Sequence, residues 1–455
     1  MTASSASPAA AAGAASTALL TDRYELTMLD AARADGTIDR PCVFELFTRR
    51  LPEGRRYAVT AGLDRAIDAI ASHRFDDEVL AALERDAVVS EPTLAWLAGY
   101  RFRGDAWALP EGEIVSPNVP AMTVSASFGD AVLLETVLLS VLNHDTAVAS
   151  AASRMVVAAD GRPLFEFGSR RTHEEAAVAA ARAAVLVGFI GTSNLEAGRR
   201  YGLRTLGTSA HAFTLVHDDE PTAFRAQIAA LGTRTTLLVD TFDVPQGIRE
   251  AVAAGGPDLD AIRIDCGDPA AEAHHARALL DELGNHDTRI VMSGDLDEHR
   301  IDACRGAPID AFGVGTAVVT GSGAPTAGFV YKLVARARER GGELEPVAKA
   351  GGGKATVGGW KAAARRFEDG VAVADVLHPW GRPPPPGSRP LQVPVIAAGE
   401  ALPRPSFATS QQHHRDTLAE LPASALDVSP GTVALPTVRE GQDPSAAQPR
   451  NGATP

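Results

Sequence analysis

The chain has 455 residues, of which 45% are hydrophobic and 22% are charged, enough apolar sequence for one large or two ordinary globular domains. Its formal net charge of −14 argues against coating nucleic acid, because phosphate backbones are bound by clustered Lys and Arg. The cysteines, Cys42, Cys266 and Cys304, form no CxxC pair, so neither a disulfide framework nor a cysteine-based zinc site is supported.

The two ends of the chain have simple compositions. The Ala/Ser-rich leader, residues 1–16, lacks the basic and strongly apolar regions of a signal peptide, so we expect it to be disordered. We expect no apolar run as long as the roughly 20 residues of a membrane-spanning helix, which predicts a cytoplasmic protein without a membrane partner. The polar tail, residues 438–455, is also expected to be disordered.

Residues 17–117 mix helical and strand patterns. Apolar residues recur at helical spacing after Thr21, and the run 42–50 is typical of a strand that ends in two arginines, Arg49 and Arg50. We therefore expect an N-terminal α/β domain over this range.

Residues 118–335 follow a repeating pattern. Short β-rich runs alternate with Ala-rich helical stretches, from AMTVSA at 121–126 to IDAFGVG at 309–315. This alternation predicts parallel strands joined by right-handed crossovers, and seven or eight such units are what a (β/α)₈ barrel requires. An open doubly wound sheet is the alternative.

Polar and glycine-rich loops follow the predicted strands. In a parallel barrel the carboxyl ends of the strands open on one face, so these loops would share a cleft. They are residues 167–170, 191–194, 208–211, 240–243, 265–268, 293–295 and 313–316. Glycines before a helix leave backbone N–H groups free to hold phosphate, which favours a phosphorylated ligand. By contrast, GGGKAT at 351–356 is no Walker A motif, because Ala355 replaces the hydroxyl residue.

Four side chains at these strand ends could carry chemistry. His211 suits an acid, a base or a nucleophile, or it is a structural histidine, and its position does not choose among them. The carboxylates of Asp240, Asp265 and Asp295 suit ribose hydroxyls, a Mg²⁺ ion that carries diphosphate, or a developing positive charge. Helix capping is the alternative for Asp295.

Taken in order, these motifs resemble the nicotinate phosphoribosyltransferase family. The matching stretches are LLTDRYELTM (19–28), FEFGSRR (165–171), GFIGTSN (188–194), GTSAHAF (207–213), LLVDTFD (237–243), IRIDCGDP (262–269), FGVGT (312–316) and GFVYKLV (328–334). The resemblance implies a type II phosphoribosyltransferase fold, in which the barrel packs on a second α/β domain. That domain would combine the N-terminal region with the post-barrel segment, residues 336–437.

The resemblance also implies a reaction. Nicotinate and 5-phosphoribosyl-1-diphosphate would give nicotinate mononucleotide and diphosphate in NAD salvage, with coupled ATP hydrolysis and Mg²⁺ as the cofactor. His211 would be the residue that ATP phosphorylates. Tyr24 and Phe167 would enclose the pyridine ring, and because the tyrosine would come from a partner subunit, a homodimer is implied. Asp240 and Asp265 would line the ribose.

Further residues would hold the charged groups of the substrates. Those implied around nicotinate and its ribosyl donor are Arg170, Thr208 and Arg263. Those implied for the loops around the 5′-phosphate are Gly294, Asp295, Gly315 and Thr316. Arg49 and Arg50 lie where diphosphate would be met, and the candidates for ATP or diphosphate after the barrel are Lys354, Lys361 and Arg365. The ligands of the metal stay unknown.

Ser193 separates the acid substrate from its amide. Nicotinamide-using relatives resemble this chain but carry an aspartate there, which accepts hydrogen bonds from the amide. An aspartate facing the carboxylate of nicotinate would cost about 1–4 kcal/mol, so Ser193 favours nicotinate. The alternatives are a nicotinamide- or quinolinate-using enzyme, and a barrel that binds a nucleotide, a flavin or a partner protein without this catalysis.

Overall fold

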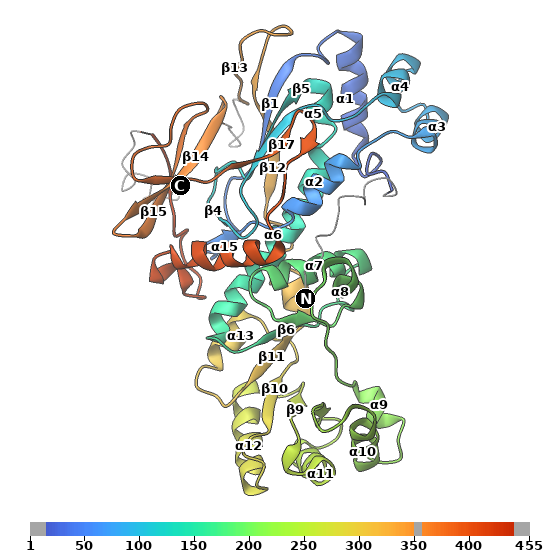
Figure 1. Cartoon of the computed structure of the whole chain (residues 1–455), viewed down its shortest axis with the longest axis vertical. Coiled ribbons are helices and arrows are strands. Elements are labelled where there is room, and N and C mark those ends of the chain that lie inside the picture. The colour runs from blue at the N-terminus through green and yellow to red at the C-terminus, as the bar shows by residue number, and fades with distance from the viewer. Residues whose placement is uncertain (1–14, 350–356, 441–455) are drawn as a thin grey trace, which may run out of the picture. The chain divides into compact units, whose positions relative to one another are not determined.

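The computed structural model describes residues 15–349 and 357–440, and the chain divides into two compact units (Figure 1). Unit 1 comprises Met1–Thr146, Thr326–Ala425 and Gly431–Pro455, and unit 2 comprises Ala147–Pro325 and Leu426–Pro430. The N-terminal region and most of the segment after the barrel thus share one unit. The barrel unit is shorter than the predicted 118–335 at both ends.

The difference in boundaries comes from two strands. β5 (Met122–Ser127) and β12 (Phe329–Arg336) both pair antiparallel with β1 (Pro41–Thr48), which places them in unit 1. Their apolar patterns predict strands. The pattern of a strand does not show which other strand it pairs with, because that depends on tertiary structure. The run 121–126 is therefore not a barrel strand.

Unit 1 is built mainly on antiparallel sheets. The largest has the order β13-β12-β1-β5-β3-β17-β18, beside smaller sheets ordered β16-β14-β15-β19 and β2-β4. The remaining strands are β2 (Ala58–Val59), β3 (Asp105–Ala108), β4 (Ile114–Val115), β13 (Glu345–Pro346), β14 (Lys361–Glu368), β15 (Val371–Pro379), β16 (Ser388–Pro390), β17 (Val393–Ala397), β18 (Glu400–Ala401) and β19 (Thr437–Arg439). The helices are α1 (Arg23–Ala34), α2 (Leu63–Ala71), α3 (Asp77–Arg85), α4 (Glu91–Ala98), α5 (Phe128–Val132), α15 (Phe407–Ala419) and the short η2 (Ala423–Leu426).

The described residues cover only part of the two ends of the chain. The helix predicted after Thr21 is α1. Most of the predicted leader and tail lies outside the described residues, but β19 pairs with β15 and buries Val438, so the tail cannot begin at 438.

One apolar stretch is longer than we expected. Residues 128–159, which include α5 and α6 (Glu135–Ala159), are long and apolar enough by length and composition to cross a membrane. However, 67% of the most apolar window is buried inside the protein, which is the ordinary condition of a core helix.

Unit 2 contains the predicted parallel sheet. Its strands are β6 (Leu164–Glu166), β7 (Gly191–Thr192), β8 (Thr236–Leu238), β9 (Ala261–Ile264), β10 (Arg289–Met292) and β11 (Ala311–Val314), in the order β7-β6-β11-β10-β9-β8. The last strand, β11, pairs with the first, β6, as a barrel requires and an open doubly wound sheet does not. The strand expected before the loop 208–211 is reduced to a single parallel bridge, Thr192 to Thr205, so the curled sheet stays open beside β8.

Helices connect successive strands of unit 2 (Figure 1). They are α7 (Glu174–Leu186), α8 (Leu195–Tyr201), α9 (His211–Leu215), α10 (Glu220–Leu231), α11 (Val244–Gly255), η1 (Gly256–Asp258), α12 (Pro269–Glu282), α13 (Glu298–Ala303) and α14 (Thr316–Val319). Several begin at a side chain that caps the first turn by accepting a backbone N–H, namely Asn194, Asp219, Asp243, Asp268 and Asp297. These caps fix where each loop after a strand ends, and so position the residues between strand and helix.

Two buried histidines of unit 1 predict acid sensitivity. Burial lowers the pKa of His73 and of His414 to about 4, from 6.5. Because the unfolded chain binds these protons more readily, stability is full above pH 6.5 and falls as the pH drops towards 4, by about 1.4 kcal/mol per pKa unit per histidine.

Urea unfolding at pH 7 and pH 4.5 measures this effect. In His414→Asn, the amide can keep the hydrogen bond that Nδ1 makes to Gly112 O, at 3.1 Å, without a titrating ring. This variant should lose about half as much stability on acidification as the unaltered protein. If the variant loses as much stability on acidification as the unaltered protein, His414 is not a source of the acid sensitivity.

Candidate active site

The carboxyl ends of three neighbouring strands are joined by hydrogen bonds between side chains and backbone. After β8, Asp240 Oδ2 accepts the backbone N–H of Asp265 at 2.8 Å. After β9, Asp265 Oδ1 accepts the hydroxyl of Ser293, which follows β10. Neither aspartate caps a helix, in contrast to Asp243 and Asp268 of the same loops. Both are therefore held in place at one edge of the sheet for a role other than capping.

His211 lies beside this aspartate pair, at the first residue of α9. Its Nδ1 is 3.2 Å from Thr241 Oγ1, and its Nε2 is 3.8 Å from Asp240 Oδ1. The His211 side chain is 42% exposed, whereas that of Asp240 is 1% exposed. Asp240 Oδ1 is buried and has no hydrogen-bond partner among residues 15–349 and 357–440. A reachable imidazole backed by a buried carboxylate is the arrangement that orients and activates a histidine.

Arg263 is a half-buried cation of the site. Its Nη1 donates to Thr208 Oγ1 at 2.7 Å and its Nη2 to Ser209 O at 3.3 Å, and its guanidinium carbon lies 6.0 Å from the centre of the Phe167 ring. Burial lowers the pKa of Arg263, although the carboxylates of Asp265 and Asp240 act in the opposite direction. A guanidinium beside an aromatic face can bind a flat anion.

Phe167 and Ser193 follow adjacent strands. A Cβ at Gly313 would lie 2.5 Å from the Phe167 ring, so the ring packs where only glycine leaves room. The backbone N–H of Ser193 donates to Glu166 O at 2.9 Å, which aligns the two loops. A cavity of about 370 Å³ inside unit 2 includes Phe167, Thr208 and Arg263 in its lining, but many of its other lining residues, such as Pro163, Thr236 and Asp310, lie at the amino-terminal ends of the strands.

The predicted phosphate loops lie at the ends of β10 and β11. Gly294 has φ +91°, and a Cβ there would lie 2.0 Å from Asp265 O, so the turn requires glycine. Asp295 is exposed, and the cap of α13 is Asp297, so the capping alternative for Asp295 is wrong. Gly315 precedes α14, and Thr316 is its exposed first residue.

Tyr24 is separate from this group. It belongs to α1 of unit 1, the unit that also contains the predicted diphosphate residues Arg49 and Arg50, whereas the predicted residues from Phe167 to Thr316 lie in unit 2. The Tyr24 side chain is 44% exposed, and partial burial together with the nearby carboxylates of Glu135 and Glu25 raises its pKa to about 12.

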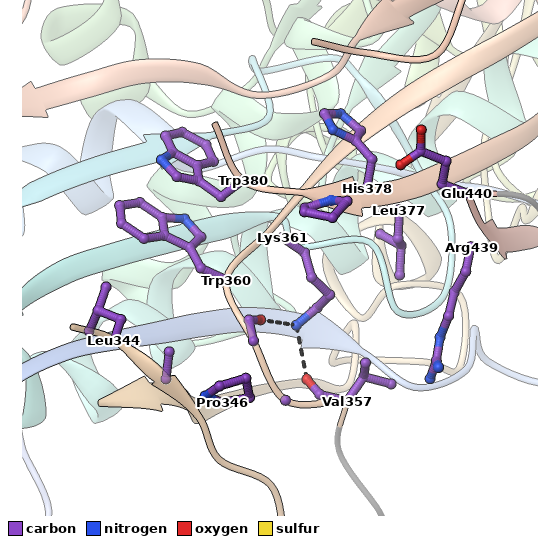
Figure 2. Close-up of a pocket in the computed structure, with 14 residues that line it drawn as sticks. Leu344, Pro346, Val357, Trp360, Lys361, Leu377, His378, Trp380, Arg439 and Glu440 are labelled. Carbon is purple, nitrogen blue, oxygen red and sulfur yellow. Dashed lines mark hydrogen bonds between the residues drawn. The ribbon is translucent and has the colours of Figure 1, made fainter. Parts of the chain in front are cut away.

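Lys361 does not offer a free cation to ATP or diphosphate. It lines a pocket of about 600 Å³ in unit 1, next to the stacked rings of Trp360 and Trp380 (Figure 2). Its Nζ donates to Val357 O at 2.9 Å and Gly359 O at 2.8 Å, and lies 2.8 Å from Glu45 Oε2. All three ammonium hydrogens are thus used within the fold. Lys354 lies outside the described residues.

Arg365 is likewise a structural residue and not a ligand for phosphate. It is fully buried, with Nη1 2.7 Å from Glu113 Oε1 and Nε 2.9 Å from Asp375 Oδ1. Burial alone would raise the pKa of Glu113, but His413, Arg365 and Arg389 together hold that pKa at about 2. The basic composition of the segment suggested anion binding, yet its arginine neutralises buried carboxylates.

Sequence reasoning missed several polar residues around the site. Thr241 contacts His211, and Glu166 accepts hydrogen bonds from Gly168 and Thr192. Glu220 is buried in α10, where burial and the carboxylates of Glu250, Asp240 and Asp243 raise its pKa to about 7. The signal available for Glu166 was its position between two phenylalanines in a buried strand, where a lone charge needs partners.

Family models match both parts of the chain. The nicotinate phosphoribosyltransferase (NAPRTase) N-terminal domain matches residues 19–143, and the nicotinate phosphoribosyltransferase (NAPRTase) family matches residues 163–337. The chain is 51% identical over 432 residues to nicotinate phosphoribosyltransferase pncB1 of Mycobacterium tuberculosis (strain CDC 1551 / Oshkosh), covering 92% of this chain and 94% of that protein. It is 39% identical to nicotinate phosphoribosyltransferase of Bacillus subtilis (strain 168), covering 70% and 67%.

Solved structures agree on the fold. Human nicotinic acid phosphoribosyltransferase is similar with a TM-score of 0.75 at 24% identity, covering 92% of this chain and 98% of that one. Nicotinate-nucleotide pyrophosphorylase from Pyrococcus furiosus is similar with a TM-score of 0.72 at 24% identity, covering 89% and 95%. The family models and the sequence identities show that the chain belongs to the nicotinate phosphoribosyltransferase family.

Proposed function

We propose that the chain is a nicotinate phosphoribosyltransferase that forms nicotinate mononucleotide and diphosphate from nicotinate and 5-phosphoribosyl-1-diphosphate, in NAD salvage. The observation that carries this proposal is the half-buried Arg263, held by Thr208 beside the ring of Phe167. An aromatic face with a guanidinium beside it suits a pyridine ring that bears a carboxylate.

The transfer step breaks the bond between C1 of the ribose and the diphosphate oxygen, and forms a bond from C1 to the pyridine nitrogen. Positive charge develops on the ribose as diphosphate leaves with the electron pair. Asp240 and Asp265 are fixed to each other at the strand ends, and their carboxylates can stabilise that charge or hold the ribose hydroxyls. Gly294 and Gly315 lie on the loops that would hold the 5′-phosphate.

Within the same proposal, ATP phosphorylates His211. The Nε2 atom attacks the γ-phosphorus, the bond to the bridging oxygen of ADP breaks, and the phosphohistidine is later hydrolysed. The exposed ring of His211 can reach a phosphoryl group, and Thr241 Oγ1, 3.2 Å from Nδ1, helps to orient the ring.

Mg²⁺ is the proposed cofactor. Among residues 15–349 and 357–440 no group of three or more His, Cys, Asp or Glu side chains could hold a metal ion. This fits Mg²⁺, which usually binds one or two carboxylates together with substrate phosphates and waters. Asp240 and Asp265 would be the carboxylates that hold it, and the ion would neutralise charge on the departing diphosphate.

We also propose a homodimer in the cytoplasm, with Tyr24 of one subunit completing the ring site of the other. Large apolar side chains are exposed in unit 2 near the site, including Leu215, Val216 and Phe242, and others are exposed near Tyr24 in unit 1. Apolar surface of this kind favours burial against a partner.

Substrate choice is tested at Ser193. Ser193→Asp should weaken use of nicotinate by about 1–4 kcal/mol in kcat/KM, because the new carboxylate opposes that of the substrate. Use of nicotinamide should rise relative to nicotinate. Ser193→Asn, which adds similar bulk without charge, is the matched control. If the aspartate and asparagine variants show the same preference for nicotinate over nicotinamide, Ser193 does not select the substrate.

The activity itself is tested by incubating the purified protein with 5-phosphoribosyl-1-diphosphate, Mg²⁺ and nicotinate, and measuring diphosphate release and the nucleotide product. Product from nicotinate is expected. Diphosphate release with quinolinate and CO₂ formation, or binding of nucleotide without any product, would support the alternatives instead.

A further inference from the structure

Glu166 is a fully buried carboxylate in the strand that leads to Phe167. It is 0% exposed, and Thr192, at the end of the adjacent strand β7, is also 0% exposed. Its Oε1 accepts the backbone N–H of Gly168, and its Oε2 accepts the hydroxyl of Thr192. Neither residue can touch a substrate, yet each is next to one that would: Glu166 precedes Phe167, and Thr192 precedes Ser193.

The hydrogen bonds around Thr192 show which group its hydroxyl hydrogen points to. Its Oγ1 accepts the backbone N–H of Asn194 at 2.9 Å, so the hydroxyl hydrogen is left for Glu166. Asn194 in turn donates from Nδ2 to Ser169 Oγ at 3.0 Å and caps α8 through Oδ1, which accepts Ala197 N–H at 2.8 Å. One continuous chain of donors and acceptors therefore links the loop after β6 to the loop after β7.

The packing leaves this linkage little freedom. A Cβ at Gly168 would lie 2.1 Å from Val319 Cγ1, 2.8 Å from Glu166 Oε1 and 3.0 Å from Gly315 O. The backbone at Gly168 is thus pressed between the Glu166 carboxylate and the loop after β11. Buried polar networks are rigid when every member has its hydrogen bonds. The buried hydrogen bonds of Glu166 and Thr192 therefore fix the separation between the Phe167 and Ser193 loops.

From this linkage we propose that Glu166 and Thr192 are positioning residues for substrate selection: they hold the ring of Phe167 and the hydroxyl of Ser193 at the spacing that accepts nicotinate. The inference rests on the proposed function, because it assigns a role to residues that support the proposed nicotinate site. Loss of the linkage would let the two loops move apart by a fraction of an ångström, which is enough to impair a positioned substrate.

Thr192→Val and Thr192→Ser form a matched pair. Valine keeps the shape but removes the hydroxyl, whereas serine keeps the hydroxyl and removes a methyl group. We expect Thr192→Val to raise KM for nicotinate on the order of 10- to 100-fold and to lower the preference for nicotinate over nicotinamide, with Thr192→Ser close to the unaltered protein. Steady-state kinetics with both substrates, together with the melting temperature of each variant, provide the measurement.

Glu166→Gln tests the other end of the linkage. The amide has one acceptor oxygen where the carboxylate has two, so either the Thr192 hydroxyl or the Gly168 N–H loses its acceptor, and the same loss of preference is expected. A merely structural role would lower the melting temperature in all three variants and leave the ratio of KM values unchanged, which would overturn the inference. If the unaltered protein does not act on nicotinate, the proposed function fails first, and the two failures are thereby distinguished.

Discussion

In a His211→Ala variant, ATP should no longer stimulate nucleotide formation, while a slower reaction that does not need ATP persists. The variant removes the proposed phosphoryl acceptor but leaves Arg263, Phe167 and the aspartate pair in place. We expect the ATP-stimulated part of the rate to fall by about 10³-fold or more, because a lost nucleophile is not replaced by a neighbour.

The measurement compares initial rates with and without ATP, and follows transfer of labelled γ-phosphate to the protein. His217→Ala is the control, since His217 is also near α9 but bonds only locally, with Nδ1 2.7 Å from Phe213 O. It should keep both ATP stimulation and labelling. Full ATP stimulation in His211→Ala would show that the phosphoryl group is carried elsewhere or not at all.

Arg365→Met is expected to destabilise unit 1 by about 3–5 kcal/mol, because removing one partner leaves a buried charge uncompensated. Glu113 and Asp375 are both 0% exposed. Glu113 would keep Arg389 and His413, at 2.8 and 3.1 Å, so most of the loss should come from Asp375.

Urea denaturation at pH 7 measures this loss, with Arg366→Met as the control. Arg366 is the next residue of β14, is 31% exposed and pairs with the exposed Glu368, so its removal should cost less than about 1 kcal/mol. Equal unfolding midpoints for the two variants would mean that the buried network contributes nothing net to stability.

The sequence predicted the parallel sheet and the strand-end site because both follow from local patterns. Alternating strands and helices announce a parallel fold, and a parallel fold gathers its strand ends on one edge. That is why His211, Asp240, Asp265 and Arg263 lie together in unit 2 as expected. The capping alternative for Asp295 failed because the cap is two residues further on, at Asp297.

What the sequence did not predict depends on long-range pairing. The partners of β5 and β12 are separated from them in the chain, so their apolar patterns could not assign them to unit 1. Lys361 and Arg365 were expected to bind anions, but their carboxylate partners Glu45 and Glu113 lie more than 250 residues away in the chain. The local sequence around a basic residue does not show whether its side chain binds phosphate or neutralises a buried carboxylate.

Competition between the two pyridines tests the central claim most directly. The unaltered protein is given equal amounts of nicotinate and nicotinamide with limiting 5-phosphoribosyl-1-diphosphate, Mg²⁺ and ATP, and the two mononucleotides are quantified by mass spectrometry. We predict that nicotinate mononucleotide is formed almost alone. Predominant formation of nicotinamide mononucleotide, or of neither product, would contradict the account.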